Sequence, residues 1–219
     1  MLIACPVTRQ AGFTLVEIAI VLVVVGLLIG GVLKGQEVIL NAKLKKIERD
    51  RSGITTAILA YQDRYRQLPG DDDQASDRFA MYSDGDNDPA AAEIDGNSDG
   101  ALDGDWVAAT NSETSNLWKH LRASGLIPGG GDDAIQPRNA YGGVIGVRDG
   151  SLLISGHVTI FGSIEGSIIR ILEDRLDDDS PASGRIQSDF TLALMDGDAA
   201  SSAGVTYLDS ARYFMAIGL

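Results

Sequence analysis

The sequence is poor in the residues that most often carry covalent bonds or catalysis. Its 219 residues include one cysteine, Cys5, and two histidines, His120 and His157. One cysteine cannot form a disulfide within the chain, so the fold needs another means of stabilisation. The histidines lack metal-ligand spacing, and the sequence has neither a Gly-x-Ser-x-Gly motif nor a phosphate-binding glycine loop. The sequence therefore gives little support for an enzyme.

Positive charge is also scarce. The chain has 18 lysines and arginines against 31 aspartates and glutamates, which gives a formal net charge of −13. Such a balance argues against a nucleic-acid-binding surface and favours solubility and the binding of cations. We therefore expect no nucleic-acid partner.

A long hydrophobic run near the N-terminus is the most informative feature present. Residues 12–17 read Gly-Phe-Thr-Leu-Val-Glu, and an almost unbroken apolar run to Leu33 follows. As a helix with a rise of ~1.5 Å per residue, this segment spans about one bilayer core. A carboxylate near the bilayer centre costs at least ~2.5–3.5 kcal/mol, which makes Glu17 a functional candidate. The alternative is a signal peptide or simple anchor with a tolerated acidic residue at its edge.

The position of the candidate cleavage site separates these alternatives. A signal peptide is cleaved after its apolar stretch, whereas Gly12 precedes the stretch. Cleavage at Gly12 would leave the hydrophobic segment on the mature chain, which would begin at Phe13. This order, with Gly12, Phe13, Thr14, Leu15 and Glu17, resembles the type IV prepilin and pseudopilin family.

The resemblance implies a processing site and an assembly residue. A membrane-embedded prepilin peptidase would remove the leader, residues 1–12, between Gly12 and Phe13, and would methylate the new amino group of Phe13. Glu17 would pair with the N-terminus of a neighbouring subunit. The physics agrees, because a buried carboxylate is tolerated when it is paired or neutralised. The alternative is that Glu17 reaches the lipid headgroups without a partner.

The charges around the run indicate an orientation that conflicts with the family. Arg9 is the only basic residue of the leader. Six basic residues follow the run: Lys34, Lys43, Lys45, Lys46, Arg49 and Arg51. The positive-inside rule alone would place the C-terminal side in the cytoplasm. The resemblance implies a single pass through the inner membrane with an extracytoplasmic head, and we adopt that orientation.

The apolar run and the periodic stripe that follows it predict a helix from Phe13 to about Tyr65. No proline occurs in this segment, so we expect one continuous helix. Residues 13–35 would form its transmembrane half and residues 36–65 its amphipathic half. Apolar residues of the second half recur every three or four positions, at Leu40, Leu44, Ile47, Ile54, Ile58, Tyr61 and Tyr65. This stripe predicts packing against the head rather than a free coiled coil. The glycines at 26, 30, 31 and 35 suit either close packing in the membrane or unwinding in a filament.

The remaining residues, 66–219, predict an α+β head in which an antiparallel sheet packs against the long helix, as in pilins. We expect helices over 111–124 and 164–176, the second capped by Ser163. We expect strands over 144–147, 152–161, 190–195, 205–207 and 213–217. Asp149-Gly150 predicts the turn between the first two strands.

An aspartate-rich loop over residues 71–105 predicts a calcium site. Oxygen-bearing side chains recur at every second residue, a spacing that suits a hard cation. The candidate ligands are Asp84, Asp86, Asp88, Asp95, Asn97, Asp99, Asp103 and Asp105. Trp106 stands where an EF-hand has its glutamate, so we predict a calcium loop without an EF-hand. The family resemblance supports calcium, and the alternative is a solvated acidic loop.

A second acidic cluster, formed by Asp174, Asp177, Asp178 and Asp179, lies at the end of the second predicted helix. Negative charge is unfavourable at a helix C-terminus, so either a bound cation or solvation must relieve it.

Together these features predict a structural protein rather than an enzyme. The leading hypothesis is a pilin or pseudopilin that assembles with other such subunits into a type IV pilus or a type II secretion filament. The alternative is a minor subunit whose calcium-stabilised head binds a surface or substrate at a filament tip. The abundance of the protein would separate the two, because a major subunit greatly outnumbers a tip subunit.

Overall fold

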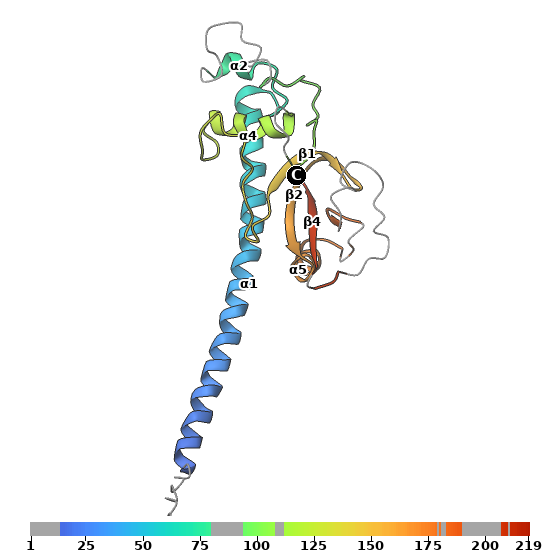
Figure 1. Cartoon of the computed structure of the whole chain (residues 1–219). Helices are drawn as coiled ribbons and strands as arrows, with labels where there is room; N and C mark the ends of the chain where they lie inside the picture. Colours follow the sequence, from blue (N-terminus) through green and yellow to red (C-terminus); the bar gives the residue numbers. More distant parts are fainter. Residues whose placement is uncertain are drawn as a thin grey trace, which may run out of the picture. The chain divides into compact units, whose positions relative to one another are not determined.

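The computed structural model describes residues 14–79, 94–107, 112–178, 180, 183–189, 207–209 and 211–219. The chain divides into two compact units, Met1–Ala42 and Lys43–Leu219. The elements in chain order are α1 (Leu15–Tyr65), α2 (Ala75–Arg78), α4 (Glu113–Ala123), β1 (Ile145–Ser151), β2 (Ile154–Glu165), α5 (Gly166–Leu176), β3 (Ile186–Asp189) and β4 (Arg212–Gly218) (Figure 1). The fold is therefore α+β, as the sequence predicts.

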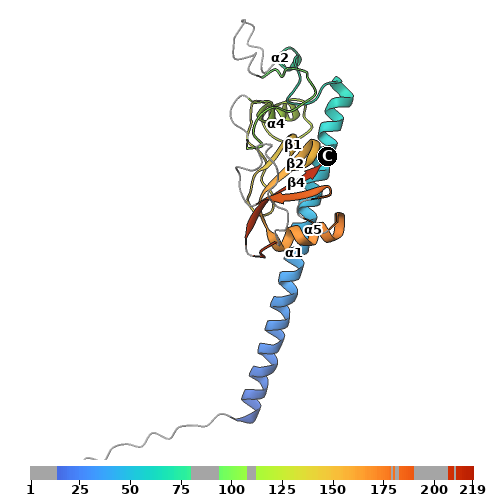
Figure 2. The same cartoon turned by 90° about the vertical axis from the view of Figure 1, so that its right-hand side faces the viewer.

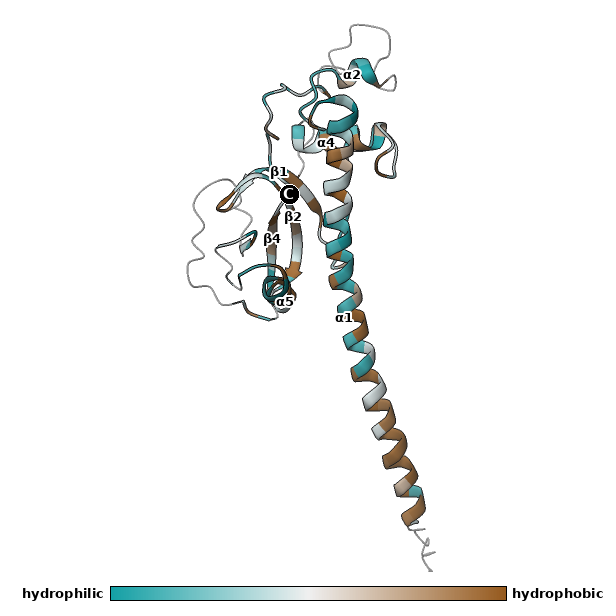
Figure 3. Ribbon diagram, turned by 180° about the vertical axis from the view of Figure 1, so that it is seen from behind, coloured by the Kyte–Doolittle hydropathy of each residue, from teal (hydrophilic) through white to brown (hydrophobic). Residues whose placement is uncertain are grey.

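The first unit consists of the N-terminal part of α1. The helix is continuous through its four glycines, so both proposed roles for them stay open. Its apolar side chains are exposed, with Leu15 at 91% and Leu27 at 73%. In Figure 3 the ribbon of this part of α1 is coloured almost throughout as hydrophobic. An 18-residue window of α1 has a mean hydropathy of 2.8 and no buried residue. By length and composition the helix can therefore cross a membrane.

In the second unit, the C-terminal part of α1 packs through the predicted stripe. Its buried residues are Leu44, Ile47, Ile54, Ala57, Ile58 and Tyr61. Arg51, which breaks the apolar pattern, donates a hydrogen bond from its guanidinium to the carbonyl of Gly218, at 3.2 Å. Arg64 donates to the carbonyl of Ser124, just past α4. The helix is thus attached to β4 and α4 by polar contacts as well as by its apolar stripe.

The sheet has the order β1-β2-β4-β3, and every neighbouring pair is antiparallel. The long strand β2 lies inside the sheet, and its residue Phe161 pairs with Ile145 of β1 and Met215 of β4. All three are fully or almost fully buried. α5 follows β2 directly and buries Ile168 and Leu172. Figure 2 shows β1, β2 and β4 beside one another with α5 at the end of β2.

The turn between β1 and β2 is displaced from its predicted position. Asp149 and Gly150 belong to β1, and the turn instead occupies Leu152 and Leu153 between the paired residues Ser151 and Ile154. The register shifts between Asp149 and Ser151 because Gly150, with φ +57°, forms a bulge there. The Asp-Gly pair therefore marks a β-bulge, another structure that accepts a left-handed glycine.

Other predicted boundaries also change in the C-terminal half. β2 extends to Glu165, so α5 begins at Gly166 and Ser163 lies within β2 rather than at a helix cap. The predicted strand over residues 190–195 lies outside the described residues, as do residues 205 and 206 of the predicted strand 205–207. Tyr207 is described and belongs to no strand, so this end of the prediction is wrong. β3 was not predicted because its four residues are too short to show an alternating pattern. The prediction of a strand ending the chain is confirmed by β4.

A buried polar network joins the end of α1 to α4. The Tyr61 hydroxyl donates to the fully buried carboxylate of Asp72 at 2.7 Å, and Arg78 pairs with the same carboxylate. His120 stacks on Tyr61, with ring centroids 6.1 Å apart. The Nδ1 atom of His120 accepts a hydrogen bond from the backbone N–H of Gly70 at 2.9 Å. A side chain cannot replace that glycine, because a Cβ would stand 2.5 Å from the carbonyl oxygen of Glu113.

Candidate functional site: the N-terminal motif and the acidic clusters

The start of α1 is closed by a reciprocal cap between Thr14 and Glu17. Oε2 of Glu17 accepts hydrogen bonds from the backbone N–H and the hydroxyl of Thr14, both at 2.8 Å. In return, the backbone N–H of Glu17 donates to the Thr14 hydroxyl at 3.2 Å. This arrangement is a capping box, which satisfies backbone donors that a helix leaves unpaired at its N-terminus.

The cap gives Glu17 a role that the sequence reasoning missed. Its signal was present, because a threonine followed three residues later by a glutamate marks a capping box. Gly12 and Phe13 lie outside the described residues, so the predicted cleavage site and the pairing of Glu17 with a Phe13 ammonium remain predictions. Within one chain, the Glu17 carboxylate already has two donors.

Comparison with known proteins identifies this segment. Residues 7–33 match the family model of the prokaryotic N-terminal methylation motif. The chain carries the prepilin-type motif. This motif is the hallmark of type IV prepilins and pseudopilin-like proteins, which are in general structural subunits rather than enzymes. No curated protein matches the chain, and no solved structure does.

The described part of the aspartate-rich loop is held in place by the carboxylate of Asp71, which was not among the predicted calcium ligands. Asp71 is buried, and its carboxylate accepts the backbone N–H groups of Asp99, at 3.3 Å, and Gly100, at 2.7 Å. Its carbonyl accepts the N–H of Ser98 at 3.2 Å. Asp71 therefore fixes the turn at residues 98–100 through backbone groups.

Glu113, at the first turn of α4, holds the other side of this loop. Its two carboxylate oxygens accept the backbone N–H groups of Asn97, at 3.1 Å, and Asp103, at 2.8 Å. Burial raises the pKa of Glu113 above its usual value, and the two backbone hydrogen bonds oppose that shift. The contacts of Asp71 and Glu113 explain how this part of a carboxylate-rich loop acquires a defined conformation.

The predicted calcium ligands are only partly visible. Asp84, Asp86 and Asp88 lie outside the described residues. Asp95 binds the N–H and hydroxyl of Ser76, and Asn97 and Asp99 accept backbone N–H groups two residues further on. Asp103 and Asp105 have exposed side chains. In the described part of the chain, none of these ligands belongs to a group of three carboxylates close enough to share a metal ion.

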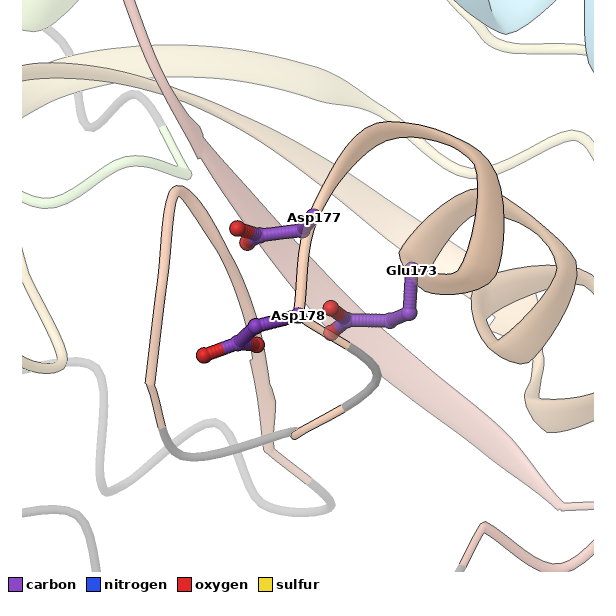
Figure 4. Close-up of side chains that lie close together, drawn as sticks. All are labelled: Glu173, Asp177 and Asp178. Carbon is purple, nitrogen blue, oxygen red and sulfur yellow. The ribbon is translucent and has the colours of Figure 1, made fainter.

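Three carboxylates do converge at the end of α5, where the sequence suggested a second cluster. Carboxylate oxygens of Glu173, Asp177 and Asp178 lie within 4.8 Å of one another (Figure 4). Asp177 and Asp178 were predicted members, whereas Glu173 was not. The spacing of four residues between Glu173 and Asp177 places both on one helix face and could have indicated it. Asp174 is exposed and outside this group, and Asp179 lies outside the described residues.

The cluster already has hydrogen-bonding partners within the chain. Glu173 is fully buried and accepts a hydrogen bond from the Tyr207 hydroxyl at 2.9 Å. Asp177 accepts the N–H of Ile186, and Asp178 accepts the Ser183 hydroxyl at 2.7 Å. The cluster thereby connects the end of α5 to the start of β3 through hydrogen bonds within the chain.

Proposed function

We propose that the chain is a filament subunit, a pilin or pseudopilin, made as a precursor. A prepilin peptidase removes residues 1–12 and methylates Phe13, and the apolar part of α1 then holds the subunit in the inner membrane with its head outside the cytoplasm. The observation that carries this proposal is the methylation motif at residues 7–33, placed directly at the start of a helix of 51 residues.

The exposed N-terminal part of α1 supports assembly with other subunits of the same class. Its apolar side chains have no partner in the described part of the chain, so they need either lipid or neighbouring helices. A membrane provides the first environment and a filament provides the second. In the filament, Glu17 would exchange its Thr14 donors for the methylated ammonium of a neighbouring Phe13.

Processing can be tested by mass spectrometry of the protein extracted from membranes. We expect an N-terminal peptide that begins with N-methylated Phe13 in cells that contain an active prepilin peptidase. In cells lacking that enzyme, the peptide should retain residues 1–12. An uncleaved, unmethylated N-terminus in peptidase-positive cells would rule out the proposed maturation.

We also propose that the acidic loop binds calcium with the low affinity typical of extracellular sites, ~10⁻⁴–10⁻³ M. The density of carboxylates in this segment supports calcium binding, because residues 71–105 contain eleven aspartates and one glutamate but only one arginine. Mutual repulsion among these carboxylates destabilises the folded loop, and a bound dication would reduce it.

The expected result is a higher melting temperature of the full chain, in detergent, in millimolar calcium than in chelator. At a tenfold excess over Kd, binding adds about 1.4 kcal/mol of stability. The double variant Asp95→Ala, Asp99→Ala should lose most of this calcium-dependent difference. Because Asp95 also binds Ser76, the variant should melt lower even in chelator, so only the difference between the two conditions is diagnostic.

The matched control is Asp132→Ala, Asp174→Ala, which removes two exposed carboxylates outside the loop. It should keep the calcium response. Equal melting temperatures in calcium, magnesium and chelator for the unmodified chain would instead favour a loop that is only solvated.

A further inference from the structure

A pocket of about 370 Å³ lies between α1, α4, β1 and the segments that follow α4. Ile54 of α1, Trp118 of α4 and Ile145 of β1 form its apolar lining, together with Ile127 and Pro128. Every lining residue belongs to the unit Lys43–Leu219. Neither the proposed anchor nor the acidic clusters contribute to it, so it is a separate feature of the head.

The lining is basic, although the protein as a whole is strongly acidic. Four cations, Lys46, Arg49, Arg122 and Arg138, face one carboxylate, Asp50. That carboxylate is already bound by Lys46, at 2.7 Å. The net charge of the chain is −13, yet this pocket has three guanidinium groups in addition to the Lys46–Asp50 pair. The pocket is therefore a local excess of positive charge on an acidic protein.

The three arginines make hydrogen bonds that position them without neutralising them. Arg49 donates to the carbonyl of Lys45 at 3.0 Å, and Arg138 donates to the carbonyl of Gly142 at 2.7 Å. Arg122 donates to the carbonyls of Pro128, Asp133 and Ile135. In the part of the chain that the structure describes, none of them forms an ion pair. Their charge is therefore available to a carboxylate-bearing ligand.

The chain itself supplies ligands of matching charge in its acidic segments, residues 71–79 and 94–105. Five aspartates there have exposed side chains: Asp73, Asp77, Asp99, Asp103 and Asp105. Contacts to Asp71, Glu113 and Ser76 hold these segments in a defined conformation. They therefore present their carboxylates without a large cost in conformational entropy on binding.

From this complementarity we infer that the basic pocket receives exposed aspartate side chains from the acidic segments of a second copy of the chain. The contact is heterologous, because one copy provides the pocket and the other the carboxylates. Such contacts build closed rings if the rotation between copies closes and open helical filaments if it does not, and a filament requires the second case. The inference rests on the proposed filament function, to which it adds a contact between the head domains of two subunits. It also gives the acidic segments a function that does not depend on calcium.

Cross-linking between isotopically distinct copies tests this contact directly. A benzophenone amino acid replaces Ile127, and full chains grown in ¹⁴N and ¹⁵N are mixed in membranes and irradiated. We expect mixed-isotope peptides that join position 127 to residues 71–79 or 94–105. The same probe at Leu59, which is exposed and outside the pocket, should give few such peptides. Adducts only within one copy, only to lipid, or to another part of the partner would overturn the inference.

Charge reversal provides the second test. Arg49→Glu together with Arg138→Glu should reduce the mixed-isotope cross-links by about fivefold or more, because like charges would then face each other. The control Arg175→Glu, Arg185→Glu changes the net charge equally at exposed positions outside the pocket. It should leave the yield unchanged. If both double variants lost the same fraction of mixed-isotope cross-links, net charge rather than the pocket would govern association.

Mass spectrometry of the N-terminal peptide in the same samples distinguishes failure of this inference from failure of the proposed function. Processed, N-methylated chains without the mixed-isotope peptides would reject the pocket contact and retain the filament proposal. Mixed-isotope peptides from chains that are never processed would support the contact and reject the proposed maturation.

Discussion

Replacing Glu17 with alanine is expected to abolish assembly while leaving membrane insertion intact. Insertion should be as efficient as in the unmodified chain, because the change removes a costly intramembrane carboxylate. Incorporation into filaments should fall by about a hundredfold or more, since the ammonium of a neighbouring Phe13 would lose its only proposed counter-ion in an apolar environment. The measurement is the amount of the subunit in sheared filaments relative to the amount in the membrane fraction.

The cap at the start of α1 makes a control necessary, because Glu17→Ala also removes the hydrogen bonds to Thr14. Thr14→Val removes the hydroxyl but keeps the Glu17 carboxylate and the backbone N–H that binds it. Loss of such a cap costs ~1 kcal/mol, so this variant should assemble within about tenfold of normal. If both variants failed equally, capping rather than pairing would be what assembly requires. Normal assembly of Glu17→Ala would disprove the pairing.

The head is expected to lose about 3 kcal/mol of stability between pH 7 and pH 4 through His120 alone. Burial lowers the pKa of His120 from 6.5 to about 4, while hydrogen bonding to Ile94 and the charges of Asp72 and Asp95 oppose the shift. Nδ1 accepts the Gly70 N–H and Nε2 faces the Ile94 carbonyl, so the neutral ring with its proton on Nε2 fits both contacts.

The sign follows from proton binding. Between pH 6.5 and 4 the unfolded chain protonates this histidine and the folded chain does not. The contribution of the neutral, buried His120 to the free energy of unfolding is therefore fully present above about pH 6.5, and it declines as the pH falls toward 4. At that pH a shift of this size corresponds to about 3 kcal/mol.

Denaturant titrations of the full chain in detergent, followed by the fluorescence of the buried residues Trp106 and Trp118, measure this effect. His120→Gln should be less stable than the unmodified chain at pH 7, and the gap should narrow by about 3 kcal/mol at pH 4. Comparing the two chains cancels the titration of the many carboxylates. A constant gap across the pH range would contradict the role of His120.

The network around His120 shows where sequence reasoning reaches its limit. His120 is fully buried and belongs to the packed interior of the head. Its partners could not be predicted, because Gly70 lies 50 positions away in the sequence. Similarly, the hydrogen bond from Arg51 to the carbonyl of Gly218 spans 167 positions, so a local pattern could not predict it.

Local signals alone determined the prepilin-type motif, the continuous helix through Tyr65 and the helix near Trp118. Hydrophobic periodicity, capping residues and the absence of proline act over a few residues, and the sequence displays them directly. Tertiary structure decided the bulge at Gly150, the gathering of Glu173 with Asp177 and Asp178, and the basic pocket. Each depends on which distant segments pack together, and a linear pattern of charges does not encode that choice. The many aspartates were visible from the start, whereas the cations that complement them become a single site only when α1, α4 and β1 meet.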